Sequence, residues 1–227
     1  AWDVDVSGNY AYVADVADGL DIIDISDPAN LIFVGNLDTE DARAVLVSGD
    51  YAYVADGSSG LRIINISDPA NPTLTETLAT TNAVGVEVSG DYAYVADGSS
   101  GLRIINISDP ANPTLTETLA TTNAVGVEVS GDYAYVADYT GGLRIIDISD
   151  PTVPSLTGTF AGSNANDGRV YSVAVNGNYA ALSCHGALRI VDISTKSLPV
   201  QVGYLATSQS RGVTMKGGYV YLADREN

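Results

Sequence analysis

The sequence predicts an all-β fold: a six-bladed β-propeller of four-stranded antiparallel blades, the last blade being incomplete in this chain. Three observations predict it. The stretch VSGDYAYVADGSSGLRIINISDPANPTLTETLATTN occurs unchanged at 47–82 and at 88–123. One part of this stretch, GDYAYVAD at 90–97, occurs six times in the chain, unchanged or with substitutions, at intervals of 40–46 residues. Each repeat reads as four short strands, and a period near 40 residues is typical of solenoids, propellers and arrays.

The third repeat shows the four strands most clearly, and we expect them at 83–89, 92–97, 102–108 and 114–120. In the first, valines alternate along AVGVEVS, which indicates a half-buried strand. The third, LRIINIS, is dense in β-branched residues. The turns between strands contain Gly-Asp, GSSG and DPANP, whose residues favour tight backbone reversals. No segment has a convincing helical period.

The repeats together predict one propeller domain over 1–227. Its repeats span 1–41, 42–82, 83–123, 124–169, 170–209 and a partial 210–227. A single repeat of this kind has two apolar faces and buries neither alone, whereas copies arranged around an axis bury both. Identical copies make compatible interfaces, so a tandem duplication explains the repeated stretch.

The strand-three motif GLRIIDISDP at 142–151 follows GDYAYVAD at 131–138, and this combination resembles the LVIVD repeat. The motif also stands at 19–28, 60–69, 101–110 and, modified, at 186–194. The resemblance covers essentially the whole chain. It implies a propeller fold and a bacterial or archaeal cell-surface location, and it carries no catalytic residue to transfer.

The composition of the chain argues against several classes of binding partner. The net charge of −18 repels nucleic acid phosphates and anionic lipids, so we expect no nucleic acid partner. No apolar run approaches the length of a membrane span, so we expect no membrane insertion. The lone Cys184 excludes an intrachain disulfide and a thiolate metal cluster. The chain opens directly in the strand pattern with AWDVDVSGNY, without an initiator methionine or a visible signal peptide, which indicates a fragment or a mature form.

Recurring polar residues have structural interpretations. Paired tyrosines such as Tyr92 and Tyr94 lie on one strand face and are expected to form a packing layer, the alternative being an aromatic platform for sugars. Aspartates that end the second strand or precede proline are expected to cap turns rather than bind calcium. The arginine of the third strand is expected to pair with a carboxylate of its own or a neighbouring blade.

The sequence favours a non-enzymatic protein without cofactor or metal. His185 is the only histidine, and its neighbour Cys184 should point to the opposite face of the strand, so the two form no catalytic dyad. The calcium-loop spacing in SNANDG at 163–168 is incomplete. Carboxylate catalysis is the alternative, with acids on inner strands: Asp3, Asp5, Glu87 and Glu128.

Function is expected where the repeat breaks its own pattern. The second residue of strand one varies, and large residues of types enriched in binding hot spots stand there: Trp2, Arg43, Tyr171 and Arg211. The long loop 161–169 adds Asn164, Asn166 and Asp167. Together they outline a candidate ligand site at the channel mouth, against the alternative of neutral drift at exposed positions.

The function predicted from this site is a non-enzymatic extracellular or cell-surface module that binds a protein or glycan. The alternatives are a glycan-active enzyme using funnel carboxylates and a purely structural spacer of a larger surface protein. A pair of carboxylates at glycosidase separation favours the enzyme. A channel closed by valines favours the spacer. The ligand's identity lies beyond the sequence.

Overall fold

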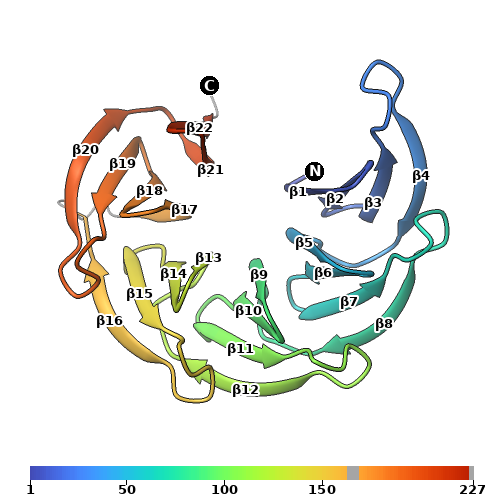
Figure 1. The fold of residues 1–227 in the computed structure, drawn as a ribbon, viewed down its shortest axis with the longest axis horizontal. Coiled ribbons are helices and arrows are strands. Elements are labelled where there is room, and N and C mark those ends of the chain that lie inside the picture. Colours follow the sequence, from blue (N-terminus) through green and yellow to red (C-terminus); the bar gives the residue numbers. More distant parts are fainter. Residues whose placement is uncertain (163–168, 225–227) are drawn as a thin grey trace. The chain divides into compact units, whose positions relative to one another are not determined.

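The computed structural model describes residues 1–162 and 169–224, and within them every regular element is a β-strand. No helix in this described part of the chain has the length and apolar character needed to cross a membrane. The strands form five four-stranded antiparallel sheets and one two-stranded sheet, each in sequence order (Figure 1). This is the β-propeller predicted from the repeats, with a partial last blade.

The chain divides into two compact units, and the first comprises Ala1–Asp97 with Arg103–Thr116. Blade one contains β1 (Asp3–Ser7), β2 (Tyr10–Asp15), β3 (Gly19–Asp24) and β4 (Ile32–Leu37). Blade two contains β5 (Ala44–Ser48), β6 (Tyr51–Ala55), β7 (Leu61–Asn65) and β8 (Thr73–Leu78). Blade three contains β9 (Gly85–Ser89), β10 (Tyr92–Ala96), β11 (Leu102–Asn106) and β12 (Thr114–Leu119), and β12 leads from the first unit into the second.

The second unit comprises Gly98–Leu102 and the chain from Glu117 onward. Blade four contains β13 (Gly126–Ser130), β14 (Tyr133–Ala137), β15 (Leu143–Asp147) and β16 (Ser155–Phe160). Blade five contains β17 (Val170–Asn176), β18 (Tyr179–Cys184), β19 (Ala187–Asp192) and β20 (Val200–Ala206). The partial sixth blade has β21 (Ser210–Lys216) and β22 (Tyr219–Asp224).

The hydrophobic core lies between neighbouring blades rather than within one. In blade two, Ile63 faces blade three and Ile64 faces blade one, because consecutive strand residues point to opposite sides. The cluster between blades one and two contains Tyr12, Leu20 and Ile22 of the former and Val45, Val54 and Ile64 of the latter. In the second unit, Tyr135 and Ile145 of blade four pack in the same way against Leu182 and Val191 of blade five. The second tyrosine of each pair is therefore a packing residue.

The paired tyrosines differ in burial, which refines the sequence interpretation. Tyr94 is only 2% exposed, whereas Tyr92 is half-buried. The equivalent Tyr221 of the partial blade is 57% exposed, because no following blade covers it within its own unit. Burial of this aromatic layer thus depends on the next blade.

In blades two, three and four, the aspartate that follows the second strand forms a buried ion pair. Asp56, Asp97 and Asp138 are fully buried, and each accepts a hydrogen bond of 2.5 Å from the Nε of the strand-three arginine of its own blade. The pairs are Arg62–Asp56, Arg103–Asp97 and Arg144–Asp138. This confirms that the repeated arginine pairs with a carboxylate.

The same carboxylates also hold the loop that enters their blade. Asp138 accepts hydrogen bonds from the backbone N–H groups of Thr122, at 3.0 Å, and Asn123, at 2.6 Å. Burial by itself raises the pKa of Asp138, but the hydrogen bonds from these two N–H groups and from Arg144 outweigh burial and lower the pKa below its ordinary value. The charged aspartate therefore joins three segments of one blade.

The exposed aspartates before proline cap turns, as expected. Asp68 and Asp109 accept hydrogen bonds from the backbone N–H two residues on, each at 3.1 Å. Asn65 and Asn106 do the same for the preceding turn, and Asp147 takes their place in blade four. An asparagine and an aspartate are interchangeable there because only an acceptor oxygen is needed.

We predict that Tyr94→Ala lowers the free energy of unfolding by about 3–5 kcal/mol, because it removes a large aromatic side chain that is almost fully buried. Tyr179→Ala is the matched control, since Tyr179 is 46% exposed, and should change stability by less than about 1 kcal/mol. Denaturant unfolding of both variants measures the difference. A loss below about 1 kcal/mol for Tyr94→Ala would show that the buried tyrosine does not stabilise the fold.

Asp138→Asn should lower the free energy of unfolding by about 2–4 kcal/mol at neutral pH, because Arg144 loses its buried counter-charge. Asp147→Asn removes the same charge from the same blade at a position where blades two and three already carry asparagine. It should cost less than about 0.5 kcal/mol. Equal losses for the two variants, measured by thermal unfolding, would contradict a special role for the buried pair.

Candidate functional site

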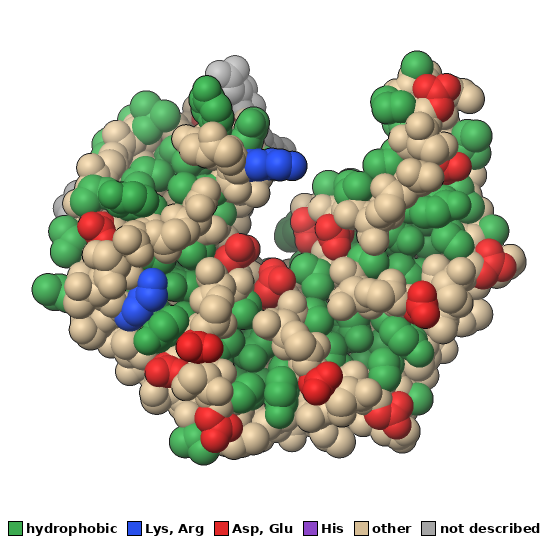
Figure 2. Space-filling model, viewed as in Figure 1, with side chains coloured by type: hydrophobic (Ala, Val, Ile, Leu, Met, Phe, Trp, Pro, Cys, Tyr) green, Lys and Arg blue, Asp and Glu red, His purple; other side chains and the backbone are tan. Residues whose placement is uncertain are grey.

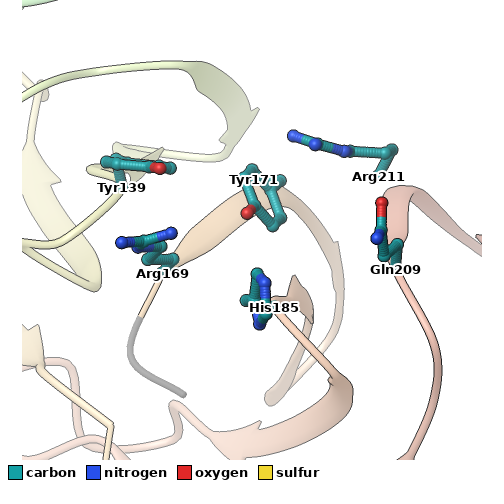
Figure 3. A pocket seen from close by; sticks show the side chains of 6 residues that line it. All are labelled: Tyr139, Arg169, Tyr171, His185, Gln209 and Arg211. Atoms are coloured by element: carbon teal, nitrogen blue, oxygen red, sulfur yellow. The ribbon is translucent and has the colours of Figure 1, made fainter. Parts of the chain in front are cut away.

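A pocket of about 230 Å³ lies in the second unit, where the turns after the second strand meet the starts of the inner strands (Figure 3). Two residues come from turns, Tyr139 in blade four and His185 in blade five. The others lie at or just before an inner strand: Arg169, Tyr171, Gln209 and Arg211. None of the lining residues within 1–162 and 169–224 is a carboxylate.

Two arginines and two tyrosines of the pocket are connected by cation–π and ring–ring contacts. The Arg169 guanidinium lies 5.4 Å from the centroid of the Tyr139 ring, and the Arg211 guanidinium lies 4.3 Å from that of Tyr171. The two rings are 5.7 Å apart and tilted by 58°. Each guanidinium is therefore within cation–π range of a tyrosine ring.

Backbone contacts fix the residues that carry these side chains. The N–H of Val170 donates to the carbonyl of Tyr139 at 2.9 Å, and the N–H of His185 donates to the carbonyl of Arg169 at 3.0 Å. The buried Ser183 donates its hydroxyl to the carbonyl of Arg211 at 3.1 Å. Serine replaces the alanine of blades two to four at this position. Blades four, five and six are therefore linked through the pocket wall.

Tyr171 and Arg211 each stand at a shift of strand register. Val170 pairs with Cys184 and Ser172 with Ser183, so Tyr171 is an extra residue on the inner strand. Arg211 is extra in the same way between Ser210 and Gly212. Such irregularities re-aim a side chain, and here both point toward one pocket.

Tyr139 has an unusual backbone for its residue type, with φ of 43°. Blades two and three carry glycine there, Gly57 and Gly98, with φ of 50° and 54°. Only glycine adopts this left-handed conformation without a steric cost. Blade four therefore keeps a strained tyrosine where its repeat offers glycine, and strained residues cluster at functional sites.

The sequence-predicted residues fall into three groups. Tyr171 and Arg211 stand together in the pocket. Trp2, 69% exposed, and Arg43 belong to the first unit, where Arg43 bonds Asp41 at 2.5 Å and Asn82 at 2.8 Å. The predicted loop residues Asn164, Asn166 and Asp167 lie outside the described residues. Arg43 has a carboxylate partner in Asp41, whereas Arg211 lies over the Tyr171 ring.

Four lining residues were not in the predicted site: Tyr139, Arg169, His185 and Gln209. Tyr139 had a detectable signal, since it breaks the repeat at a glycine position. Arg169 replaces the asparagine found at Asn82 and Asn123, and it ends the loop 161–169 that the sequence singled out. His185 is exposed while Cys184 beside it is buried, so the two side chains indeed diverge.

Comparison with known families agrees with the repeat architecture. The profile described as LVIVD repeat matches residues 1–39, 40–80, 81–121, 122–161, 167–207 and 209–227. The chain belongs to the LVIVD repeat family. No curated protein matches this LVIVD repeat chain.

Solved structures similar to the LVIVD repeat chain share its fold. A candidate 6-phosphogluconolactonase from Bacteroides uniformis has 14% identity and a TM-score of 0.84, with 98% of this chain and 77% of that chain covered. The periplasmic gluconolactonase of Pseudomonas aeruginosa has 12% identity and a TM-score of 0.78, covering 97% and 72%. The Cps50 β-propeller domain from Myceliophteria thermophila has 12% identity and a TM-score of 0.75, covering 99% and 84%. Identities this low support the fold alone.

The inner-strand carboxylates of the LVIVD repeats have different surroundings. Asp3 and Asp5 on β1 accept hydrogen bonds from the backbone N–H groups of Val45, at 3.0 Å, and Val47, at 2.7 Å. They tie blade one to blade two, which is a structural role. Glu87 lies on β9 in the first unit and Glu128 on β13 in the second. Loss of hydration raises the pKa of Glu128 to about 7.

The acidic residues of this LVIVD repeat chain raise the question of a metal site. Within residues 1–162 and 169–224, no group of three or more His, Cys, Asp or Glu side chains is arranged to hold a metal ion. The SNANDG segment at 163–168 lies outside the described residues. The recurrent aspartates are instead engaged by backbone N–H groups and arginines.

The raised pKa of Glu128 predicts a stability change with pH. Below about pH 4.5 the glutamate is protonated in both the folded and unfolded chain, so its full contribution is present. Between about pH 4.5 and 7 this glutamate is ionised in the unfolded chain but still protonated in the folded chain, so stability falls over that range and levels off above it. Glu128→Gln should remove this slope and stabilise the protein by about 1–2 kcal/mol at pH 8, since one pKa unit corresponds to about 1.4 kcal/mol and hydration of the half-buried group reduces the effect.

Urea unfolding at pH 4.5, 6 and 8 measures this slope. The matched control is Glu117→Gln on β12, a surface residue that removes the same charge. Its pH dependence should follow that of the unmodified chain. A Glu128→Gln variant with an unchanged slope between pH 4.5 and 8 would contradict the assigned pKa.

Proposed function

We propose that this chain is a non-enzymatic extracellular module, displayed at the cell surface, that binds a glycan or protein ligand through the pocket of the second unit. The observation that carries the proposal is the convergence of six polar and aromatic residues on that pocket, at positions where the repeat changes. Residues with only a packing role have no need to depart from the repeat. The small volume and polar lining favour a glycan over a protein.

The regular part of the protein supports a binding role rather than catalysis. Asp56, Asp97 and Asp138 are engaged in ion pairs, and Asp3 and Asp5 accept backbone hydrogen bonds. Blades with these contacts form a rigid scaffold on which a few substituted residues recognise a ligand. Tyrosine and arginine are the types that contribute most to such recognition.

A glycan-active enzyme is the second candidate, and the raised pKa of Glu128 favours it. A carboxylic acid with a pKa near 7 is suited to general acid catalysis at neutral pH. Under this alternative, Glu128→Gln abolishes turnover of a bound glycan. Under the binding proposal, Glu128→Gln leaves glycan affinity unchanged, and the chain releases no product from glycans that it binds.

A glycan array probed with the labelled chain tests the binding proposal. The unmodified chain should bind a defined set of glycans, and Tyr171→Ala with Arg211→Ala should weaken that binding by about 2 kcal/mol or more, the scale of hot-spot truncation. The control double variant, Tyr179→Ala with Lys216→Ala, removes one tyrosine and one basic side chain at exposed strand positions outside the pocket. Loss of binding in both double variants, or no binding by the unmodified chain, would favour a structural spacer.

A further inference from the structure

We infer that the pocket recognises the carboxylate of an acidic sugar, a uronic acid residue, with the edges of Arg169 and Arg211 as its anion-binding groups. This inference deepens the proposed function and rests on it. Arg169 and Arg211 differ from the four arginines of this chain that have an aspartate partner. Arg62, Arg103 and Arg144 each have a buried aspartate, and Arg43 has Asp41.

Arg169 and Arg211 are held by rings instead of acids. Within the described part of the chain, neither forms an ion pair, and the Nε of Arg169 is buried without a hydrogen-bond partner. The guanidinium carbon of each lies over a tyrosine ring, 5.4 Å from the centroid for Arg169 and 4.3 Å for Arg211. A guanidinium without a carboxylate partner can donate two parallel hydrogen bonds to the carboxylate of a ligand.

The charge around the pocket supports an anionic ligand locally, although the whole chain is acidic. Figure 2 shows acidic side chains distributed over the visible face with only isolated basic ones. In the described part of the chain, the residues that line the pocket include two arginines and no acid. Asp224, which contacts Gln209, already accepts hydrogen bonds from the backbone N–H groups of Ser208 and Gln209. Because salt screens charges beyond about 8 Å at physiological ionic strength, the two nearby guanidiniums dominate over distant carboxylates.

The remaining lining groups favour a sugar over an apolar acid. Gln209, His185 and the tyrosine hydroxyls supply both donors and acceptors for hydroxyl groups. None of the described residues that line the pocket is aliphatic, whereas sites for apolar ligands are lined mainly by hydrophobic residues. The pocket of about 230 Å³ is smaller than a typical drug-sized site, so it fits a single or terminal sugar residue.

Isothermal titration calorimetry with glucuronic acid, glucose and inorganic sulfate tests the inference at pH 7, in a buffer without carboxylate or phosphate. We expect glucuronic acid to bind at least tenfold more tightly than glucose or sulfate. Arg211→Gln should weaken glucuronic acid binding about tenfold or more, the effect of losing a charged hydrogen-bond donor. Lys216→Gln, which removes one exposed positive charge from the same strand, should change affinity less than twofold.

A second variant separates ligand recognition from folding. Tyr139→Gly restores the glycine of blades two and three at a left-handed backbone position, so the variant should be at least as stable as the unmodified chain. It removes the ring that supports Arg169, so glucuronic acid affinity should fall about threefold or more.

The outcomes distinguish this inference from the proposed function. Equal binding of glucose and glucuronic acid, lost in the Tyr171→Ala and Arg211→Ala double variant, would overturn the acidic-sugar assignment and keep the glycan-binding module. Sulfate binding as tight as that of glucuronic acid would reduce the pocket to a simple anion site and overturn the sugar assignment. Unchanged glucuronic acid affinity in both Arg211→Gln and Tyr139→Gly would place the ligand elsewhere.

Discussion

Packing between neighbouring sheets is the interaction on which the rest of this protein depends. Every complete blade alternates its strand residues between two apolar faces, so each blade needs a neighbour on both sides. In blade two, Tyr53 and Ile63 pack toward blade three while Val54 and Ile64 pack toward blade one. A buried leucine or isoleucine contributes roughly 1.5–3 kcal/mol, and such residues recur at the same positions in blades two, three and four. This requirement explains both the faithful duplication of the sequence and the exposure of Tyr221 where no further blade follows in its unit.

The buried aspartate–arginine pair holds segments within each of blades two to four in place. It fixes the turn after strand two against the third strand and against the entering loop, in blades two to four. Blade five departs from it, with Cys184 in place of the aspartate, while Arg189 hydrogen-bonds Gln201 and lies 5.3 Å from the Tyr204 ring. The residues that line the pocket differ from the residues at the same positions in the regular repeats. Residues that keep the repeat pattern form the scaffold, and residues that depart from it supply the charged and aromatic groups of the site.

Much of the fold could be predicted from the sequence because its information is repeated. The third blade was expected at 83–89, 92–97, 102–108 and 114–120, and its strands occupy Gly85–Ser89, Tyr92–Ala96, Leu102–Asn106 and Thr114–Leu119. Site residues were harder to find, because each occurs once. Tyr171 and Arg211 were found by comparing one repeat position, but Tyr139 required knowing that its glycine counterparts have positive φ. The pairing of Arg43 with Asp41 depends on side-chain geometry that a repeat alignment does not contain.

The central claim is that Arg169 and Arg211 are the chain's ligand-binding arginines, whereas the repeated arginines hold the scaffold. Nuclear magnetic resonance of the arginine Nε–H groups during titration with glucuronic acid tests it most directly. The account predicts shifts of the Arg169 and Arg211 signals that saturate together, while those of Arg62, Arg103 and Arg144 stay in place because their Nε–H groups remain bonded to aspartates. Shifts confined to the aspartate-bound arginines, or no shift of Arg169 and Arg211 at saturating sugar, would contradict the account.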